Sequence, residues 1–266
     1  MKWLFLSLLL TGFSPSKIHV PESAPPICGL KNTAFKNGEV VKMIVFYNTL
    51  GIYAGAGEAT FTTNVERFNG RPVYHVVGSG KTYPFFDNFF KVRDRYESYI
   101  DTATLLPVKF IRNVDEGGHT IYNNVSFNHD AKTAVSTKGA FPITDCIQDV
   151  ISAVYYSRNI NFDQYQVGDK IPFDMYLDDE VYHLYIKYMG KEKIKTKYGK
   201  FRAIKIKPLL VKGTIFEGGE NMTAWVSDDP NRLLLRAESP ILVGKIKVDM
   251  MGYSNLRYPL SSLLSL

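Results

Sequence analysis

Apolar and polar residues alternate along most of the chain after residue 38, which is the period of a β-strand with one buried face. The alternating runs are rich in β-branched and aromatic residues, and Gly, Asn, Asp and Pro separate them at short intervals. The pattern predicts roughly a dozen strands. They include residues 39–48, 52–62, 72–80, 91–101, 105–111, 119–127, 131–137, 170–177, 181–187, 233–239 and 241–252.

Between two groups of strands the apolar period lengthens to that of an α-helix. The residues at this spacing are Ile143, Ile147, Val150, Ile151, Val154 and Tyr155. Thr144 or Asp145 can serve as the N-cap, and Gln148, three residues after Asp145, completes a capping-box pattern. We therefore predict one central α-helix over about 144–157.

Short turns between consecutive strands favour antiparallel pairing of neighbours. We predict an all-β fold, a large antiparallel meander that curls into a barrel or half-barrel, with the helix at an open end. Because all-β domains of this length are common, residues 38–266 are expected to form a single β-rich domain. A division into two β halves between about 140 and 165 is the alternative.

The N-terminus has a different pattern. Lys2 precedes a short apolar run, and small residues follow it, as in a secretory signal peptide. The run is too short to span a bilayer. We predict a signal peptide over 1–16, an N-terminal extended segment over 17–37, and an exported mature chain without a transmembrane segment. The first cysteine, Cys28, lies too far on for a lipid anchor.

Two cysteines, Cys28 and Cys146, make a disulfide possible in an exported chain. Such a bond would close a long loop and stabilise the fold by about 2–4 kcal/mol. Two unpaired buried thiols are the alternative. Neither cysteine has a cysteine or histidine neighbour at the spacing of metal ligands, so no metal site is expected.

The formal net charge is +6, and the basic residues are spread along the chain. The densest group alternates with other residues, as on the solvent-exposed face of a strand. It consists of Lys191, Lys193, Lys195, Lys197 and Lys200. We expect no binding of nucleic acid. Motifs of serine hydrolases, P-loop enzymes and zinc proteases are absent from the sequence, so we assign no catalytic residue and no cofactor.

The chain also carries three distinctive stretches: GIYAGAGEA at 51–59, FFKVRDRYESYID at 89–101 and WVSDDPNR at 225–232. With these it resembles a family of exported bacterial proteins that contain the domain of unknown function 3108. The resemblance spans most of residues 38–255. It implies a β-rich protein of the cell envelope, and we expect the periplasm of a Gram-negative bacterium. The family has no established activity, so the resemblance implies no catalytic residue.

Aromatic side chains concentrate at one turn within the second of these stretches and just before it. They are Phe85, Phe86, Phe89 and Phe90. They form either an apolar mouth for a lipid-like ligand or an envelope protein, or a corner of the core where the chain turns. The core is the favoured interpretation, because clustered large aromatic residues are normally buried.

The charged run that follows divides into two faces if it is a strand. Arg93, Arg95 and Tyr99 share one face, where they could bind a carboxylate, phosphate or sugar, although a solvated, salt-bridged face is favoured. Asp94 lies on the more apolar face. A carboxylate there is either a polar anchor or proton-transfer group inside the barrel, or half of a cross-strand ion pair, which is favoured.

Three functional hypotheses follow. The leading one is a non-enzymatic envelope protein that binds an apolar or amphiphilic ligand, or a partner polypeptide, in the curled sheet. Its candidate ligand-binding residues are Phe85, Phe86, Phe89, Phe90, Arg93, Asp94, Arg95 and Tyr99. The second is a carbohydrate-active enzyme in which Asp94, or Asp145 with Asp149, meets Arg93 and Tyr99 in one cleft within about 10 Å. The third is a structural subunit of an envelope assembly.

Overall fold

We analysed a computed structural model that describes residues 27–49, 52–212, 218–241 and 244–266. The predicted signal peptide, residues 1–16, lies outside the described residues, as does the first part of the predicted extended segment. No helix within the described ranges is long and apolar enough to cross a membrane.

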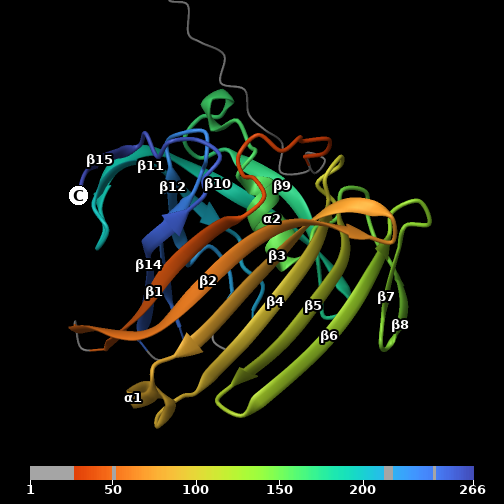
Figure 1. Ribbon diagram of the computed structural model, residues 1–266, viewed down its shortest axis with the longest axis horizontal. Coiled ribbons are helices and arrows are strands. Elements are labelled where there is room, and N and C mark those ends of the chain that lie inside the picture. Colours follow the sequence, from red (N-terminus) through yellow and green to blue (C-terminus); the bar gives the residue numbers. More distant parts are fainter. Residues whose placement is uncertain (1–26, 50–51, 213–217, 242–243) are drawn as a thin grey trace, which may run out of the picture.

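The strands form one antiparallel sheet that curls around a common interior (Figure 1). It is a 15-stranded sheet in the order β8-β7-β6-β5-β4-β3-β2-β1-β14-β13-β12-β11-β10-β9, with β15 paired to β11. The first eight strands are β1 Glu39–Thr49, β2 Ile52–Phe68, β3 Arg71–Thr82, β4 Val92–Asp101, β5 Pro107–Glu116, β6 His119–Asn128, β7 Thr133–Ser136 and β8 Gly139–Pro142. The others are β9 Lys170–Leu177, β10 Glu180–Lys195, β11 Lys200–Pro208, β12 Thr223–Ser227, β13 Leu234–Pro240, β14 Lys245–Ser254 and β15 Leu263–Ser265. The predicted all-β antiparallel meander is confirmed.

Three short helices accompany the sheet: α1 Pro84–Asp87, α2 Val150–Ser157 and the 3-10 helix η1 Phe162–Gln164. The central helix is shorter than predicted, and its predicted N-cap is wrong. Asp149 is the N-cap, and its carboxylate accepts hydrogen bonds from the backbone N–H groups of Ile151 and Ser152, both at 2.8 Å. The capping box joins Asp149 to Ser152 rather than Asp145 to Gln148.

The segment before α2 is not helical, because other partners occupy its backbone. Gln148 donates its backbone N–H to Asp174 of β9 and accepts from the N–H of Tyr176. Cys146 has a φ of 60°, which an α-helix cannot contain. Ile143 and Ile147 therefore fill the core from an irregular segment that contains a turn, although their spacing in the sequence is helical.

α2 lies inside the curl of the sheet, where its buried side packs against β3 and β4 (Figure 1). Ser98 of β4 donates a hydrogen bond of 2.6 Å to the other oxygen of the Asp149 carboxylate. Gly78 on β3 is needed at this contact, because a Cβ there would lie 2.9 Å from the ring of Phe61 and 3.4 Å from Ile151. The helix thus fills the upper part of the interior.

Within the described residues the two edge strands of the sheet, β8 and β9, do not pair with each other, and we call this open side of the curl the seam. Several other interactions connect the segments on the two sides of the seam. Cys28 and Cys146 form a disulfide, with Cα atoms 5.5 Å apart. Ile27 donates its backbone N–H to Pro172 of β9. An open, curled sheet of this kind corresponds to the half-barrel form of the predicted fold.

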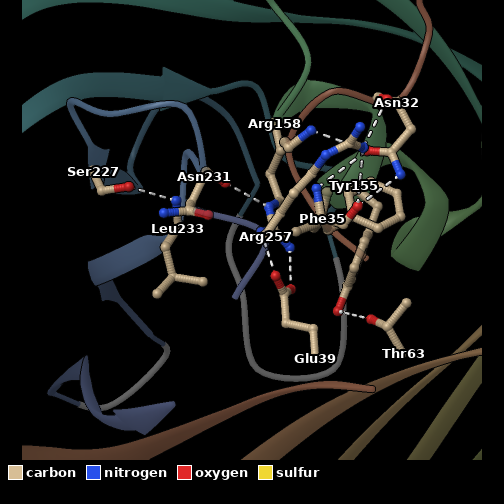
Figure 2. A network of polar contacts seen from close by, with 12 residues as sticks. Asn32, Phe35, Glu39, Thr63, Tyr155, Arg158, Ser227, Asn231, Leu233 and Arg257 are labelled. Atoms are coloured by element: carbon tan, nitrogen blue, oxygen red, sulfur yellow. Dashed lines mark hydrogen bonds and ion pairs between the residues drawn. The ribbon is translucent and has the colours of Figure 1, made fainter. Parts of the chain in front are cut away.

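A buried ion pair connects the end of α2 to β1 (Figure 2). Arg158 donates to both carboxylate oxygens of Glu39, at 2.6 and 3.0 Å, and to the carbonyl oxygen of Asn231. Its guanidinium also lies over the rings of Phe35 and Tyr155. Because every polar atom of this network has partners and both charges are buried, we interpret it as structural.

Candidate functional site

An aromatic tip, consisting of Phe85, Phe86, Phe89 and Phe90, projects from the sheet where β3 turns into β4 (Figure 1). The side chains of Phe85, Phe89 and Phe90 are 68%, 74% and 44% exposed. The favoured prediction of a core corner is therefore wrong. Helix α1 is only 4 residues long and has no buried residue, so these rings have no core to pack into.

Polar interactions hold the aromatic tip in place. Asp87 accepts two hydrogen bonds from the Arg93 guanidinium, at 3.0 and 2.5 Å, and a third from the hydroxyl of Thr82. The Arg93 hydrogen bond, supported by that of Thr82, lowers the pKa of the Asp87 carboxyl. Asp87 is therefore ionised at neutral pH. A fixed loop presents the phenylalanines, so little conformational entropy would be lost on binding.

The tip also rests on the neighbouring hairpin between β5 and β6. Gly117 has a φ of 61°, and a Cβ there would lie 2.5 Å from the ring of Phe90. Gly117 also donates its N–H to the carbonyl oxygen of Lys91, at 2.7 Å. Only glycine allows this close approach, which brings the tip and the hairpin together at one rim of the curled sheet.

Asp94 lies on the inner face of β4 at the same rim. It is directly opposite Gly80 of β3 and Val114 of β5 in the strand register. Its Oδ1 atom is buried and has no hydrogen-bond partner within the described part of the chain. The favoured cross-strand ion pair is therefore wrong, because neither directly opposite residue carries a charge.

The pKa of Asp94 is raised to about 7, chiefly by burial and then by the nearby carboxylates of Glu116 and Asp115, while a hydrogen bond with the backbone of Asp115 opposes the shift. Tyr96, two residues along the same face, has its pKa raised to about 12, chiefly by burial and then by Asp94. Near neutral pH Asp94 therefore exists in both protonation states. It can accept a hydrogen bond or donate one without a large change in free energy.

Arg112 also lies on the inner face, and it is not among the site residues predicted from the sequence. Arg112 is opposite Tyr96 in the register and binds Asn123 and Asp178. Its guanidinium thus binds Asn123 and Asp178 rather than Asp94. Arg112 could have been found from the alternation of Phe110, Arg112 and Val114, because this pattern places one arginine on an otherwise apolar face.

The other predicted binding residues lie on the outer face of β4. The carboxylate of Glu97 binds Arg95 at 2.8 Å and His75 at 2.8 Å. Tyr99 stacks on His75, with ring centroids 4.2 Å apart. Arg95 and Tyr99 are thus part of a salt-bridged outer surface and do not meet Asp94.

The carboxylates of the enzyme hypothesis do not form one cleft. Asp145 is exposed and pairs with Lys132 at 2.9 Å, whereas Asp149 is buried as the cap of α2. Arg93 belongs to the aromatic tip. The prediction of a shared cleft is wrong, because Asp145 and Asp149 have separate structural partners and Asp94 faces inward, away from Arg93 and Tyr99 on the outer face of β4.

The interior beside α2 offers little space. A cavity of about 10 Å³ lies between the helix and strands β9 and β10, lined by residues that include Tyr156, Ile160 and Ile171. Such a volume holds about one water molecule. Within the described ranges, no group of three His, Cys, Asp or Glu side chains is placed to hold a metal ion. The candidate site is therefore the rim, defined here as the aromatic tip together with Asp94.

Comparison with known proteins gives a family and a fold. The family model described as "Protein of unknown function (DUF3108)" matches residues 43–251. No curated protein matches the chain. The crystal structure of a β-barrel-like protein of the domain of unknown function DUF1849, from Brucella abortus, superposes with a TM-score of 0.58 at 7% identity. The match covers 85% of this chain and 100% of that one, and it concerns the fold alone.

Two further solved structures are more distant. One is described as a putative lipoprotein from Parabacteroides distasonis, with a TM-score of 0.36 and 13% identity over 86% of this chain and 100% of that one. The other is described as a putative exported protein with a YmcC-like fold from Bacteroides fragilis, with a TM-score of 0.32 and 12% identity over 86% of this chain and 100% of that one.

Proposed function

The chain belongs to the DUF3108 family of proteins of unknown function, and from this premise we propose that it is a non-catalytic protein that binds an amphiphilic ligand at its rim. The observation that carries the proposal is the combination of exposed phenylalanines with a buried, unsatisfied carboxylate oxygen at the same end of the sheet. The tip supplies apolar surface, and Asp94 supplies a hydrogen-bonding group for a polar head or hydroxyl.

Two physical arguments favour this ligand class. Exposed apolar groups of this size on a soluble domain usually mark a binding surface. A buried oxygen without a partner costs about 1–3 kcal/mol, and a ligand that donates a hydrogen bond to it would recover that cost. A purely apolar ligand would leave Asp94 unsatisfied. A partner polypeptide that contacts the tip alone would leave the inward-facing carboxylate unused as well.

We place the protein outside the cytoplasm, in the periplasm of a Gram-negative bacterium. The disulfide between Cys28 and Cys146 supports this location, because such bonds persist in oxidising compartments. A protein there could carry or sense an amphiphile in the aqueous space between membranes.

The test is a ligand search on the purified chain. Solvent extraction followed by mass spectrometry should recover a lipid-like molecule, and a dansyl-labelled fatty acid should bind. Because burial of one phenylalanine contributes about 1.5–3 kcal/mol, the double variant Phe85→Ser/Phe89→Ser should bind the probe more than tenfold less tightly. Tyr122→Ser/Val135→Ser is the matched control, since these side chains are also exposed but lie on β6 and β7.

The proposal fails if no lipid is recovered and the probe does not bind, or if the two double variants weaken probe binding equally. All four substitutions are at exposed positions, so each variant should unfold at nearly the wild-type urea concentration.

A further inference from the structure

The end of the β10–β11 hairpin carries four cationic side chains on one face. They are Lys193 and Lys195 of β10 and Lys200 and Arg202 of β11. In the strand register Lys193 is directly opposite Arg202, and Lys195 is directly opposite Lys200. Between them, the side chains of Ile194 and Phe201 point to the other face, where they are 9% and 0% exposed. We call the four residues the cationic square.

No acid neutralises the cationic square among the residues that the structure describes. Glu192, the acidic residue within this part of the hairpin, binds Lys205 and Trp225. Asp163 and Asp228 both bind Lys191, at 2.7 and 3.0 Å. Arg202 donates to the carbonyl oxygen of Ser261. Like charges directly opposite on paired strands destabilise a sheet, and this hairpin has two such pairs in succession. An arrangement that costs stability calls for a functional explanation.

An apolar side chain adjoins these charges. Strand β15 pairs with β11, with Leu263 opposite Phe201 and Ser265 opposite Lys200. Leu263 packs against the core with Phe201. The register shifts between these two pairs, at Leu264, which is 42% exposed next to the end of the hairpin. The surface therefore combines charge with an exposed apolar residue.

We propose that the cationic square docks the protein on a bilayer that contains anionic phospholipids. Lysine and arginine side chains fit lipid phosphates, and each basic residue near such a surface raises affinity by about fivefold. Leu264 distinguishes a bilayer from a dissolved polyanion, since only a bilayer offers an apolar layer beneath the phosphates. The hairpin lies beside β15 and away from α1, so this surface is separate from the rim (Figure 1). The inference is independent of the proposed ligand.

The experiment measures co-sedimentation of the full chain with vesicles made of equal parts of phosphatidylcholine and phosphatidylglycerol, and with vesicles of phosphatidylcholine alone. We expect binding to the anionic vesicles only, and weaker binding as salt is added. The variant Lys193→Gln/Lys195→Gln should bind about 30-fold less tightly. The matched control, Lys36→Gln/Lys42→Gln, removes the same charge from exposed positions elsewhere and should bind as the wild type does.

Urea denaturation of each variant shows whether a loss of vesicle binding results from a loss of folding. Because Lys193→Gln/Lys195→Gln removes repulsion between opposite cations, it should be at least as stable as the wild type. Equal binding to both kinds of vesicle would overturn the proposal, as would equal weakening by the two variants. Inorganic polyphosphate serves as the competing probe. If the chain binds polyphosphate in solution but does not sediment with anionic vesicles, the cationic square recognises a dissolved phosphate polymer. The proposal that it docks on a bilayer would then be wrong.

Discussion

Arg112 of β5 and Asp178, in the turn between β9 and β10, form an ion pair across the open side of the sheet. Along the hydrogen-bonded path these strands are separated by most of the sheet, yet their side chains meet. Lys138 and Asp179 form a second pair nearby, at 3.0 Å. Side chains, together with the disulfide, therefore close a curl that the backbone leaves open.

Replacement of Arg112 by Met should destabilise the protein. The variant loses the ion pair with Asp178 and leaves the buried amide oxygen of Asn123 without its donor, so we expect the free energy of unfolding to fall by about 1–3 kcal/mol. Urea denaturation measures the change. Lys138→Met is the control, since Lys138 is 68% exposed and its pair should contribute no more than about 1 kcal/mol. An equal loss in the two variants would show that Arg112 has no special role in the seam.

Asp94 should make the protein less stable as pH rises through the acidic range. Its pKa is about 7 in the folded chain and 3.8 ordinarily, so between these values the folded state binds more protons than the unfolded state. The free energy of unfolding therefore falls as pH rises across this window and levels off above it. Asp94→Asn removes this dependence.

Wild type and Asp94→Asn should consequently be compared by urea denaturation at about pH 4 and about pH 8. From pH 4 to pH 8 the free energy of unfolding of the variant should rise by about 1–2 kcal/mol relative to that of the wild type. This value is reduced for solvent screening of the partly exposed carboxyl. A stability difference that does not vary with pH would contradict the raised pKa of Asp94.

Asp149→Ala should show where α2 begins. The change removes the N-cap hydrogen bonds to Ile151 and Ser152 and leaves the buried hydroxyl of Ser98 without its acceptor. We expect a loss of about 2–3 kcal/mol in the free energy of unfolding. Asp145→Ala, at the N-cap predicted from the sequence, should cost less than about 0.5 kcal/mol, because Asp145 has only an exposed ion pair. Thermal melts of both variants measure the two losses. A larger loss for Asp145→Ala would support the longer helix that was predicted from the sequence.

Reduction of the disulfide should weaken the seam. The bond joins residues 118 positions apart, so the reduced chain gains conformational freedom when it unfolds, and we expect a loss of about 2–4 kcal/mol. Melting temperatures with and without reductant measure this loss. The Cys28→Ser/Cys146→Ser variant should match the reduced wild type and should not respond to reductant. A response of that variant would mean that the reductant acts elsewhere.

Much of the fold could be predicted because the alternation of apolar and polar residues is local. Strand β9 has the predicted bounds, and Asp94 lies on the inward face that the period of two assigns to it. Contacts between distant segments explain the errors. Ile143 and Ile147 follow a helical period, but the disulfide at Cys146 and the pairing of Gln148 with β9 hold their segment in a non-helical conformation.

The candidate site was harder to predict for a related reason. The phenylalanines of the aromatic tip look like core residues in sequence, and only the short turn between β3 and β4 leaves them outside the sheet. Similarly, the sequence could not show that Arg112 would bind Asp178 rather than Asp94, because that choice depends on how far the sheet curls.

The disulfide and the hydrogen bond from Ile27 to Pro172 also set an order of events during biosynthesis. A chain made from its N-terminus presents Ile27 and Cys28 long before their partners exist. Strands β1 to β8 can pair as they emerge, whereas the N-terminal segment must wait for residues 146 and 172 before it can dock. The seam is thus completed late, and until then the edges of β8 and β9 stay accessible to chaperones and to other chains.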